Sequence, residues 1–115
     1  VIVVEENKKL LEASEKSIKE NNINNVVLFN NEIAKGCHEQ SPFNAIIIEG
    51  AVEEVPKNIV DQLENGGRMI AIISDNGACT AKMHKKRGLS ISTSKLFNCS
   101  IPVLNSFKMK NSFSF

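Results

Sequence analysis

The chain has 115 residues, a mass of 12.7 kDa and a formal net charge of +1 at pH 7. This length leaves room for one domain that buries roughly 65% of its unfolded surface. The near-neutral charge gives no electrostatic reason to expect nucleic acid or a membrane as a partner. No apolar run approaches the ~20 residues of a membrane-spanning helix. The 3 cysteines are far apart and form no CxxC pair, which is typical of reduced thiols, so we expect a cytoplasmic protein without a metal site.

The first segment, VIVVEE, begins as a buried strand over Val1 to Val4 and ends in two acids. No methionine, cap or turn precedes the strand, so we expect the chain to be the C-terminal piece of a longer protein. Asn7 is a good N-cap for the next helix. That helix has one apolar face, formed by Leu10, Leu11, Ser14 and Ile18, and Asn21 and Asn22 can end it.

A second strand is predicted over Val26 to Phe29, followed by a polar connection from residue 30 to 40 with one helical turn around Ile33. Ala45 to Ile48 is a short run of apolar residues, which predicts a strand buried on both faces. Met69 to Ile73 predicts another buried strand. A helix is expected between these two, because Pro56 suits a first turn and the residues Ile59, Val60 and Leu63 fall on one face.

Gly66 and Gly67 would end that helix, which completes a parallel strand, helix and strand unit. The tail differs, since Asp75-Asn76-Gly77 signals a turn and two alternating segments, 78–86 and 89–97, predict an antiparallel hairpin with its tip at Arg87-Gly88. Pro102 places the segment from Ile101 to Leu104 at an edge or bulge. The expected fold class is α/β: a partial, three-layer Rossmann-like sheet of βαβ units followed by a C-terminal antiparallel hairpin.

Two motifs resemble a known family. PFNAIIIEGA, then Val55-Pro56, then IVDQLENGGRMIAII resembles the second half of the protein-L-isoaspartate O-methyltransferases. Gln62, Leu63, Gly66, Gly67 and Arg68 match the Gln-Leu-x-x-Gly-Gly-Arg run of that family, whereas Asn44 stands where the family has an acid. KMHKKRG and KLFNCSIPVL resemble its C-terminal hairpin and the Leu-Phe-x-x-x-x-Pro-x-Leu segment.

The resemblance implies that residues 1–115 form the C-terminal portion of one S-adenosylmethionine-dependent methyltransferase domain. The parent protein would methylate isoaspartyl carboxylates of proteins or peptides, with S-adenosyl-L-methionine as donor. The family's Gly-rich loop, which cradles the methionyl part of the donor, is not in this sequence. We therefore expect the chain alone to have no methyltransferase activity, and no catalytic residue can be assigned.

Glu5 is the first candidate for binding the cofactor. An acid at the end of the second strand of a doubly wound fold accepts hydrogen bonds from the ribose hydroxyls of a nucleoside. The resembling family has Glu at this position, and Glu6 is the neighbouring alternative. The competing interpretation is a solvated acid stabilised by the dipole of the following helix.

Asn31 and Glu32 are the next candidates. The family carries Gly-Asp-Gly after its third strand, and the acid is expected to meet the edge of the adenine. Aligning on Gly36 places Asn31, Glu32 and Ile33 there, so both glycines are replaced. Cys37 stands where the family usually has Trp. An exposed loop acid is the alternative for Glu32.

The remaining candidates are weaker. Glu49 and Gly50 are expected at the carboxyl end of a buried strand, where ligands of this architecture bind, and Glu49 is a general base or a solvated acid. His38 and His84 lack metal-ligand spacing and are expected at the surface. A basic cluster (Lys82, Lys85, Lys86 and Arg87) is expected at the hairpin tip, as a charged turn rather than a nucleic-acid site.

In a methyltransferase sheet, a further strand lies between those of residues 1–4 and 45–48. Without it, two apolar strand edges carry unpaired backbone groups. Either these strands pair directly or a second copy fills the gap, and we expect a homo-oligomer through the exposed edges. Two other interpretations stay open. A nucleotide-binding Rossmann-type domain would not end in an antiparallel hairpin, and a non-catalytic scaffold would not bind S-adenosylhomocysteine.

Overall fold

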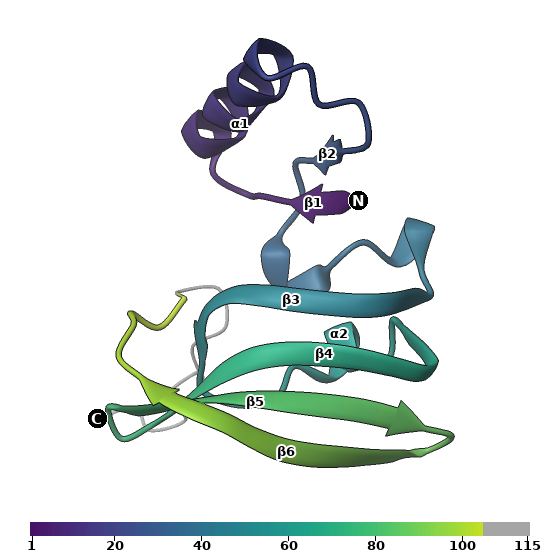
Figure 1. Cartoon of the computed structure of the whole chain (residues 1–115), viewed down its shortest axis with the longest axis vertical. Helices are drawn as coiled ribbons and strands as arrows, with labels where there is room; N and C mark the ends of the chain where they lie inside the picture. Colours follow the sequence, from purple (N-terminus) through teal and green to yellow (C-terminus); the bar gives the residue numbers. More distant parts are fainter. Residues whose placement is uncertain (105–115) are drawn as a thin grey trace, which may run out of the picture.

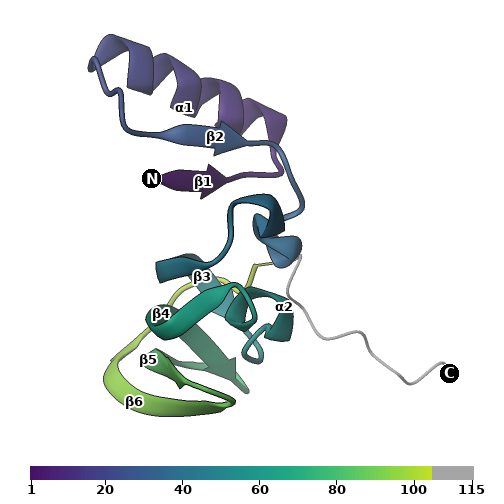
Figure 2. The same ribbon diagram turned by 90° about the vertical axis from the view of Figure 1, so that its right-hand side faces the viewer.

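The strands of this protein form two separate sheets. The computed structural model describes residues 1–104. Strands β1 (Ile2–Val4) and β2 (Val27–Phe29) form a two-stranded parallel sheet, with helix α1 (Lys8–Glu20) between them in sequence. A mixed sheet follows in the order β3-β4-β5-β6, made of β3 (Phe43–Val52), β4 (Leu63–Asp75), β5 (Ala78–Arg87) and β6 (Ser90–Cys99). Strands β1 and β2 and helix α1 are called the N-terminal unit below. Figures 1 and 2 show this unit beyond β3, at one side of the four-stranded sheet.

The N-terminal unit contains the predicted strands and helix, but β1 is half-buried and Val1 is exposed, so the prediction of a buried strand there is wrong within residues 1–104. The side chain of Asn7 caps α1 by accepting hydrogen bonds from the N–H groups of Lys9 and Leu10, at 3.0 and 3.1 Å. The helix ends at Asn21, and Asn22 takes the left-handed conformation with a φ of 53°. The predicted apolar face is half-buried except at Leu10, which is 57% exposed.

The four-stranded sheet confirms the predicted change from parallel to antiparallel pairing. β3 and β4 are parallel, whereas β4 pairs with β5 and β5 with β6 in antiparallel register. Asn76 and Gly77 form the first hairpin turn, with φ values of 51° and 87° that suit a tight primed turn. The second turn lies between Arg87 and Ser90, as the sequence predicts.

The helix between β3 and β4 is shorter than predicted. Helix α2 covers only Lys57–Val60, with Pro56 as its N-cap, and β4 already begins at Leu63. The backbone N–H of Phe43 donates to the carbonyl of Gln62 at 2.7 Å, so pairing with β3 replaces the next helical turn. The predicted helix end at Gly66 and Gly67 is therefore wrong, because both glycines lie inside β4. Leu63 is still buried, which explains why its position fits a helical pattern.

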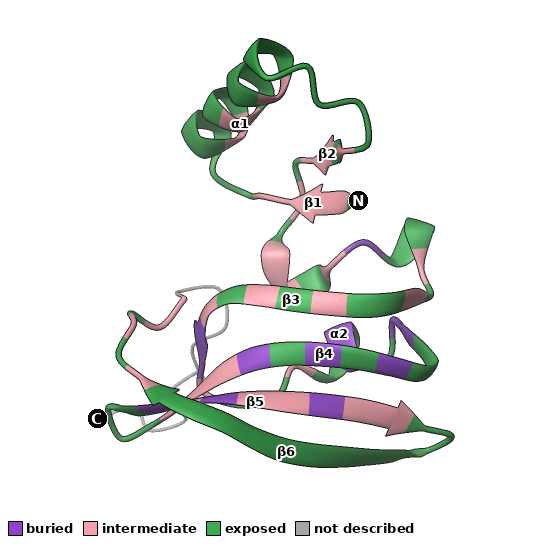
Figure 3. Cartoon of the chain, viewed as in Figure 1, coloured by how far each residue is buried: buried purple, intermediate pink, exposed green. Residues whose placement is uncertain are grey.

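The core lies between α2 and one face of the sheet (Figure 3). Its buried members are Val52, Ile59, Val60, Leu63, Met69 and Ala71. Ile46 and Ile48 pack against this cluster, but Ile47, which points to the opposite face of β3, is 67% exposed. The prediction that this strand is buried on both faces is therefore wrong for residues 1–104, in which nothing covers the face that carries Ile47.

The segment after β6 returns to the free edge of β3. The N–H of Ala51 donates to the carbonyl of Pro102 at 3.2 Å, and the N–H of Leu104 donates to the carbonyl of Ala51 at 2.8 Å. This confirms the predicted edge segment. The Leu104 side chain lies against Gly50, where a Cβ atom would come within 2.4 Å of it. Residues 105–115, with their three phenylalanines, lie outside the described residues.

β1 and β3 do not pair. They belong to different sheets among residues 1–104. Direct pairing of these two strands, the first of the two alternatives expected from the sequence, is therefore not observed. The connection between the sheets contains two short 3₁₀ helices, η1 (Ile33–Lys35) and η2 (His38–Gln40), where one helical turn was predicted. None of the helices over this described range is long and apolar enough to cross a membrane.

Candidate functional site

The carboxyl ends of β1 and β2 lie side by side, which brings the predicted cofactor residues to one edge. The parallel register pairs Val4 with Phe29, and the N–H of Glu5 donates to the carbonyl of Phe29 at 3.0 Å. Glu5 therefore follows β1 next to the point where the chain leaves β2 toward Asn31 and Glu32. Ligands of doubly wound folds bind at this kind of edge.

Glu5 is half-buried and lies before the N-terminus of α1. One carboxylate oxygen accepts a hydrogen bond from the backbone N–H of Asn7 at 3.4 Å. This contact holds the side chain at the edge, next to the positive end of the helix dipole. A carboxylate has several lone pairs and no proton to donate, so it can accept further hydrogen bonds from hydroxyl groups.

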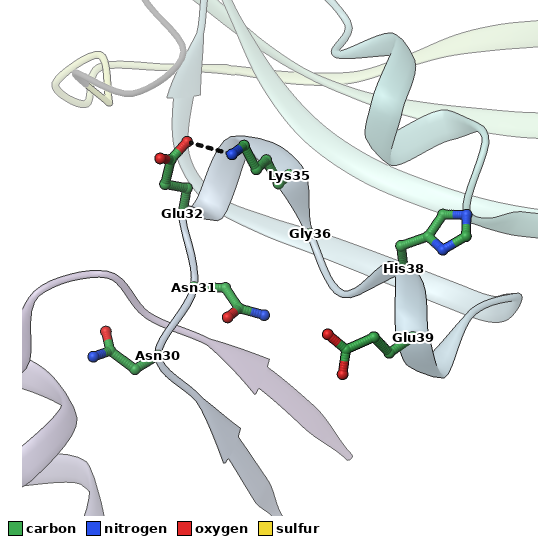
Figure 4. Close-up of a pocket in the computed structure, with 7 residues that line it drawn as sticks. All are labelled: Asn30, Asn31, Glu32, Lys35, Gly36, His38 and Glu39. Carbon is green, nitrogen blue, oxygen red and sulfur yellow. Dashed lines mark ion pairs between the residues drawn. The ribbon is translucent and has the colours of Figure 1, made fainter.

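Asn31 and Glu32 line a cavity of about 410 Å³ between the end of β2 and η2 (Figure 4). Its other lining residues are Asn30, Lys35, Gly36, His38 and Glu39. Asn31 and Glu39 point toward the same space, whereas the Glu32 carboxylate turns toward Lys35, with 3.6 Å between oxygen and ammonium nitrogen. Both partners of this ion pair are exposed, so its contribution to stability is small.

Gln62 holds the wall of this cavity, although it does not line it. Its side chain is buried, with 4% exposed. The Oε1 atom accepts a hydrogen bond from the N–H of Cys37 at 2.9 Å, and Nε2 donates to the carbonyls of Lys35 and Asn58 at 2.7 and 3.1 Å. Gly36 lies between Lys35 and Cys37 in the sequence and has a φ of +63°. Gln62 matches a family motif in the sequence, but that match predicts no role for it.

Other predicted residues lie elsewhere. Glu49 and Gly50 were expected at the carboxyl end of a strand, but they lie inside β3, in an irregularity between Ile47 and Ala51. That prediction is wrong, because β3 continues to Val52. His38 is exposed as predicted and also lines the cavity. Lys35 and Glu39 also line the cavity but were not predicted, since a polar loop shows no periodicity that marks which side chains face a cavity.

His84 is buried, not at the surface as predicted. It is 2% exposed on the core face of β5, next to Met69 on β4. Its Nδ1 lies 3.0 Å from the hydroxyl of Thr93, and its buried Nε2 has no hydrogen-bond partner. Burial, and to a smaller extent the positive charge of Lys82, lowers the pKa of His84 below its usual 6.5. The imidazole also lines a second cavity, of about 320 Å³, beside α2.

The predicted basic cluster is spread along β5 and is not gathered at the hairpin tip. Lys82 and Lys85 are half-buried, Lys86 donates to the carbonyl of Leu63 at 3.0 Å, and only Arg87 adjoins the turn. Over residues 1–104, no group of three or more His, Cys, Asp or Glu side chains is placed to hold a metal ion. The three thiols are free.

Comparison with known proteins identifies this arrangement. The sequence model of the protein-L-isoaspartate(D-aspartate) O-methyltransferases matches residues 1–106. The chain is 32% identical over 96 residues to the protein-L-isoaspartate O-methyltransferase of Hahella chejuensis, covering 84% of this chain and 46% of that protein. It is 37% identical over 78 residues to the enzyme of Parvibaculum lavamentivorans, covering 68% of this chain and 35% of that protein.

Solved structures give the same fold. A protein-L-isoaspartate O-methyltransferase superposes with a TM-score of 0.83 at 25% identity, over 91% of this chain and 34% of the other. A Plasmodium falciparum structure assigned to the same enzymes, in complex with S-adenosyl-L-homocysteine, superposes with a TM-score of 0.78 at 23% identity, over 92% of this chain and 52% of the other. These neighbours confirm the predicted partial Rossmann-like methyltransferase sheet.

The chain thus spans between a third and a half of the length of the curated relatives that it matches. The motif around Gln62, the antiparallel strands β5 and β6, and the family match over residues 1–106 agree with one another. The chain belongs to the protein-L-isoaspartate(D-aspartate) O-methyltransferase family.

Proposed function

We propose that the edge formed by Glu5, Asn31 and Glu32 is the nucleoside end of a binding site for S-adenosyl-L-methionine. Residues 1–115 would form the C-terminal portion of a single methyltransferase domain. The parent protein would transfer a methyl group from this donor to isoaspartyl carboxylates of proteins or peptides. The observation that carries the proposal is that β1 and β2 end at a shared edge. Glu5 therefore lies beside the start of the loop that contains Asn31 and Glu32, and these two residues line the cavity.

The residues present fit the adenosine part of such a ligand. A half-buried carboxylate suits a pair of ribose hydroxyls, and Asn31 offers both donors and acceptors to the edge of a base. The two glycines that the family has here are not needed for the backbone. Among residues 1–104, Asn22 and Asn76 are the non-glycine positions with positive φ, so Asn31 and Ile33 take ordinary conformations.

The chemistry divides between the donor and the protein. Bound S-adenosylmethionine supplies a methyl group that is activated by its sulfonium. The residues of this chain bind and orient the nucleoside, because positioning supplies most of the acceleration in such a transfer.

We propose that the 115-residue chain alone gives no turnover, and a labelled-methyl assay with an isoaspartyl peptide tests this. Incorporation above the blank would contradict it.

We also propose that the chain alone self-associates through the free edges of β1 and of residues 43–50 in β3. Their backbone groups have no strand partner on that side within the described residues, and Ile47 is exposed nearby. Light scattering at micromolar concentration should give the mass of a dimer or larger species, and a monomeric mass would contradict the proposal.

The three free thiols support a cytoplasmic location.

The proposed nucleoside site is tested by titrating the 115-residue chain with adenosine and following its amide resonances by NMR. Glu5→Gln removes the negative charge that favours hydroxyl donors and should weaken binding by about tenfold, the effect of ~1.4 kcal/mol. Glu12→Gln, at an exposed acid of α1, is the matched control and should leave binding unchanged. The wild type should also bind 2′,3′-dideoxyadenosine more weakly. Equal binding of both nucleosides by all three proteins would refute the role of Glu5.

A non-catalytic scaffold descended from the family is the second candidate, favoured by the replaced glycines at Asn31 and Ile33. The parent protein would then show no binding of S-adenosylhomocysteine by calorimetry. A general nucleotide-binding domain is disfavoured, because β5 and β6 run antiparallel to their neighbours.

A further inference from the structure

We propose that Gln62 is a positioning residue for the nucleoside site. Its hydrogen bonds to Lys35 and Cys37, on either side of Gly36, set the loop that forms the cavity wall. This inference rests on the proposed function and names the residue that gives its site a fixed shape. Gln62 lies before β4, outside the cavity, and contacts the loop from behind.

The hydrogen bonds of Gln62 fix the orientation of its amide. Nε2 has two hydrogens, and each meets a backbone carbonyl, of Lys35 and of Asn58. Oε1 meets the N–H of Cys37. Reversing the amide would set its oxygen against two carbonyl oxygens, so only one orientation is compatible with these partners. Because the side chain is buried, losing it would leave those backbone groups without their partner.

Gly36 fits this contact in two ways. Its φ of +63° is a conformation that side chains rarely adopt. A Cβ atom there would lie 2.6 Å from Oε1 and 2.9 Å from Nε2 of Gln62, and 2.8 Å from the Cδ1 atom of Ile59. The amide of Gln62 therefore occupies the space that a side chain at position 36 would need. Gly36 and Gln62, from two separate segments of the sequence, therefore fit together in one contact.

The contact ties the loop to the four-stranded sheet. The carbonyl of Gln62 accepts the N–H of Phe43 at 2.7 Å, so the backbone of Gln62 is joined to β3 while its side chain is joined to Lys35 and Cys37. Lys35 and Gly36 line the cavity, as does His38 just beyond Cys37. In Figure 1 the two 3₁₀ helices of this loop lie between the N-terminal unit and β3. Gln62 thereby holds the adenine side of the site in register with the sheet.

The first experiment compares Gln62→Met with Gln40→Met in the 115-residue chain. Methionine keeps the size of the side chain and removes all three hydrogen bonds, and Gln40, the other glutamine, is exposed at the end of the same loop. Gln62→Met should speed hydrogen exchange at the Cys37 amide and weaken adenosine binding by about tenfold, measured where circular dichroism shows the protein folded. Gln40→Met should change neither.

The second variant, Gln62→Glu, keeps the test decisive if Gln62→Met does not fold. An ionised carboxylate cannot donate to the carbonyls of Lys35 and Asn58, whereas a protonated one can donate to one of them and still accept from Cys37. Burial beside carbonyl oxygens should raise the pKa of this glutamate above the usual ~4.3. Adenosine binding relative to wild type should therefore recover between pH 7.5 and pH 5.5, which a purely structural defect would not do.

The outcomes separate the two proposals. No adenosine binding by the wild type would contradict the proposed function and, with it, the positioning role of Gln62. Wild-type affinity in Gln62→Met with faster exchange at Cys37, or no recovery of Gln62→Glu at low pH, would overturn the positioning role alone. Weakened binding and pH-dependent recovery would support it.

Discussion

Substituting Gly36 by alanine should destabilise the protein far more than the same change at another glycine of similar backbone conformation. The methyl group would overlap the Gln62 amide, which lies 2.6 to 2.9 Å from the Cβ position, so the amide must move away. Three hydrogen bonds then break, at about 1 kcal/mol each. The positive φ adds a net cost of about 0.5–1 kcal/mol, after the gain from a less flexible unfolded chain. The expected loss is about 3.5–4 kcal/mol.

Gly88 provides the matched control. Its φ is +59°, close to the +63° of Gly36, but no atom lies within 4 Å of its Cβ position. Gly88→Ala should therefore cost only the backbone contribution, about 0.5–1 kcal/mol. Urea unfolding followed by circular dichroism measures both variants. In the double variant Gly36→Ala/Gln62→Ala the overlap is removed, so its loss should fall short of the sum of the single losses by at least ~1 kcal/mol. Equal losses for Gly36→Ala and Gly88→Ala would refute the proposed contact.

Two further predictions concern other parts of the chain. Asn7→Ala removes the cap of α1 and should lower the free energy of unfolding by about 1 kcal/mol, whereas Asn24→Ala, at an exposed position, should not; urea unfolding measures both, and equal values would show that the cap contributes nothing. Because the folded state lowers the pKa of His84 below 6.5, the unfolded chain binds a proton more readily. The stability present above pH 6.5 should thus decline as the pH falls toward 5.5. Urea midpoints at the two ends of this range should differ less in His84→Gln than in His38→Gln, and an unchanged difference would contradict the assignment to His84.

The sequence predicted the elements whose signals are local. Asn7 marked the start of α1, Asn76-Gly77 marked a turn, and Arg87-Gly88 located the tip of the predicted hairpin, because caps and tight turns depend on a few adjacent residues. The motif around Gly66 and Gly67 identified the family correctly even though its structural interpretation was wrong. The glycines belong to β4, where pairing with β3 overrides the helical pattern of Ile59, Val60 and Leu63.

The site was only partly predictable for a related reason. Glu5, Asn31 and Glu32 follow strand ends, so their placement follows from the order of the strands. The contact between Gln62 and Gly36 joins residues 26 positions apart in the sequence and depends on the packing of α2 against the loop, which no local pattern reports. His84 was misplaced because alternation in β5 shows two faces but does not say which one the core covers.

The central claim is that the edge after β1 and β2 binds a nucleoside, and the location of bound adenosine tests it most directly. Intermolecular nuclear Overhauser effects can be measured between adenosine and the isotope-labelled chain. The account predicts contacts from the ribose protons to Glu5 and from the adenine protons to Asn31 and Glu32. Contacts confined to another surface, such as the exposed strand β6, would contradict it.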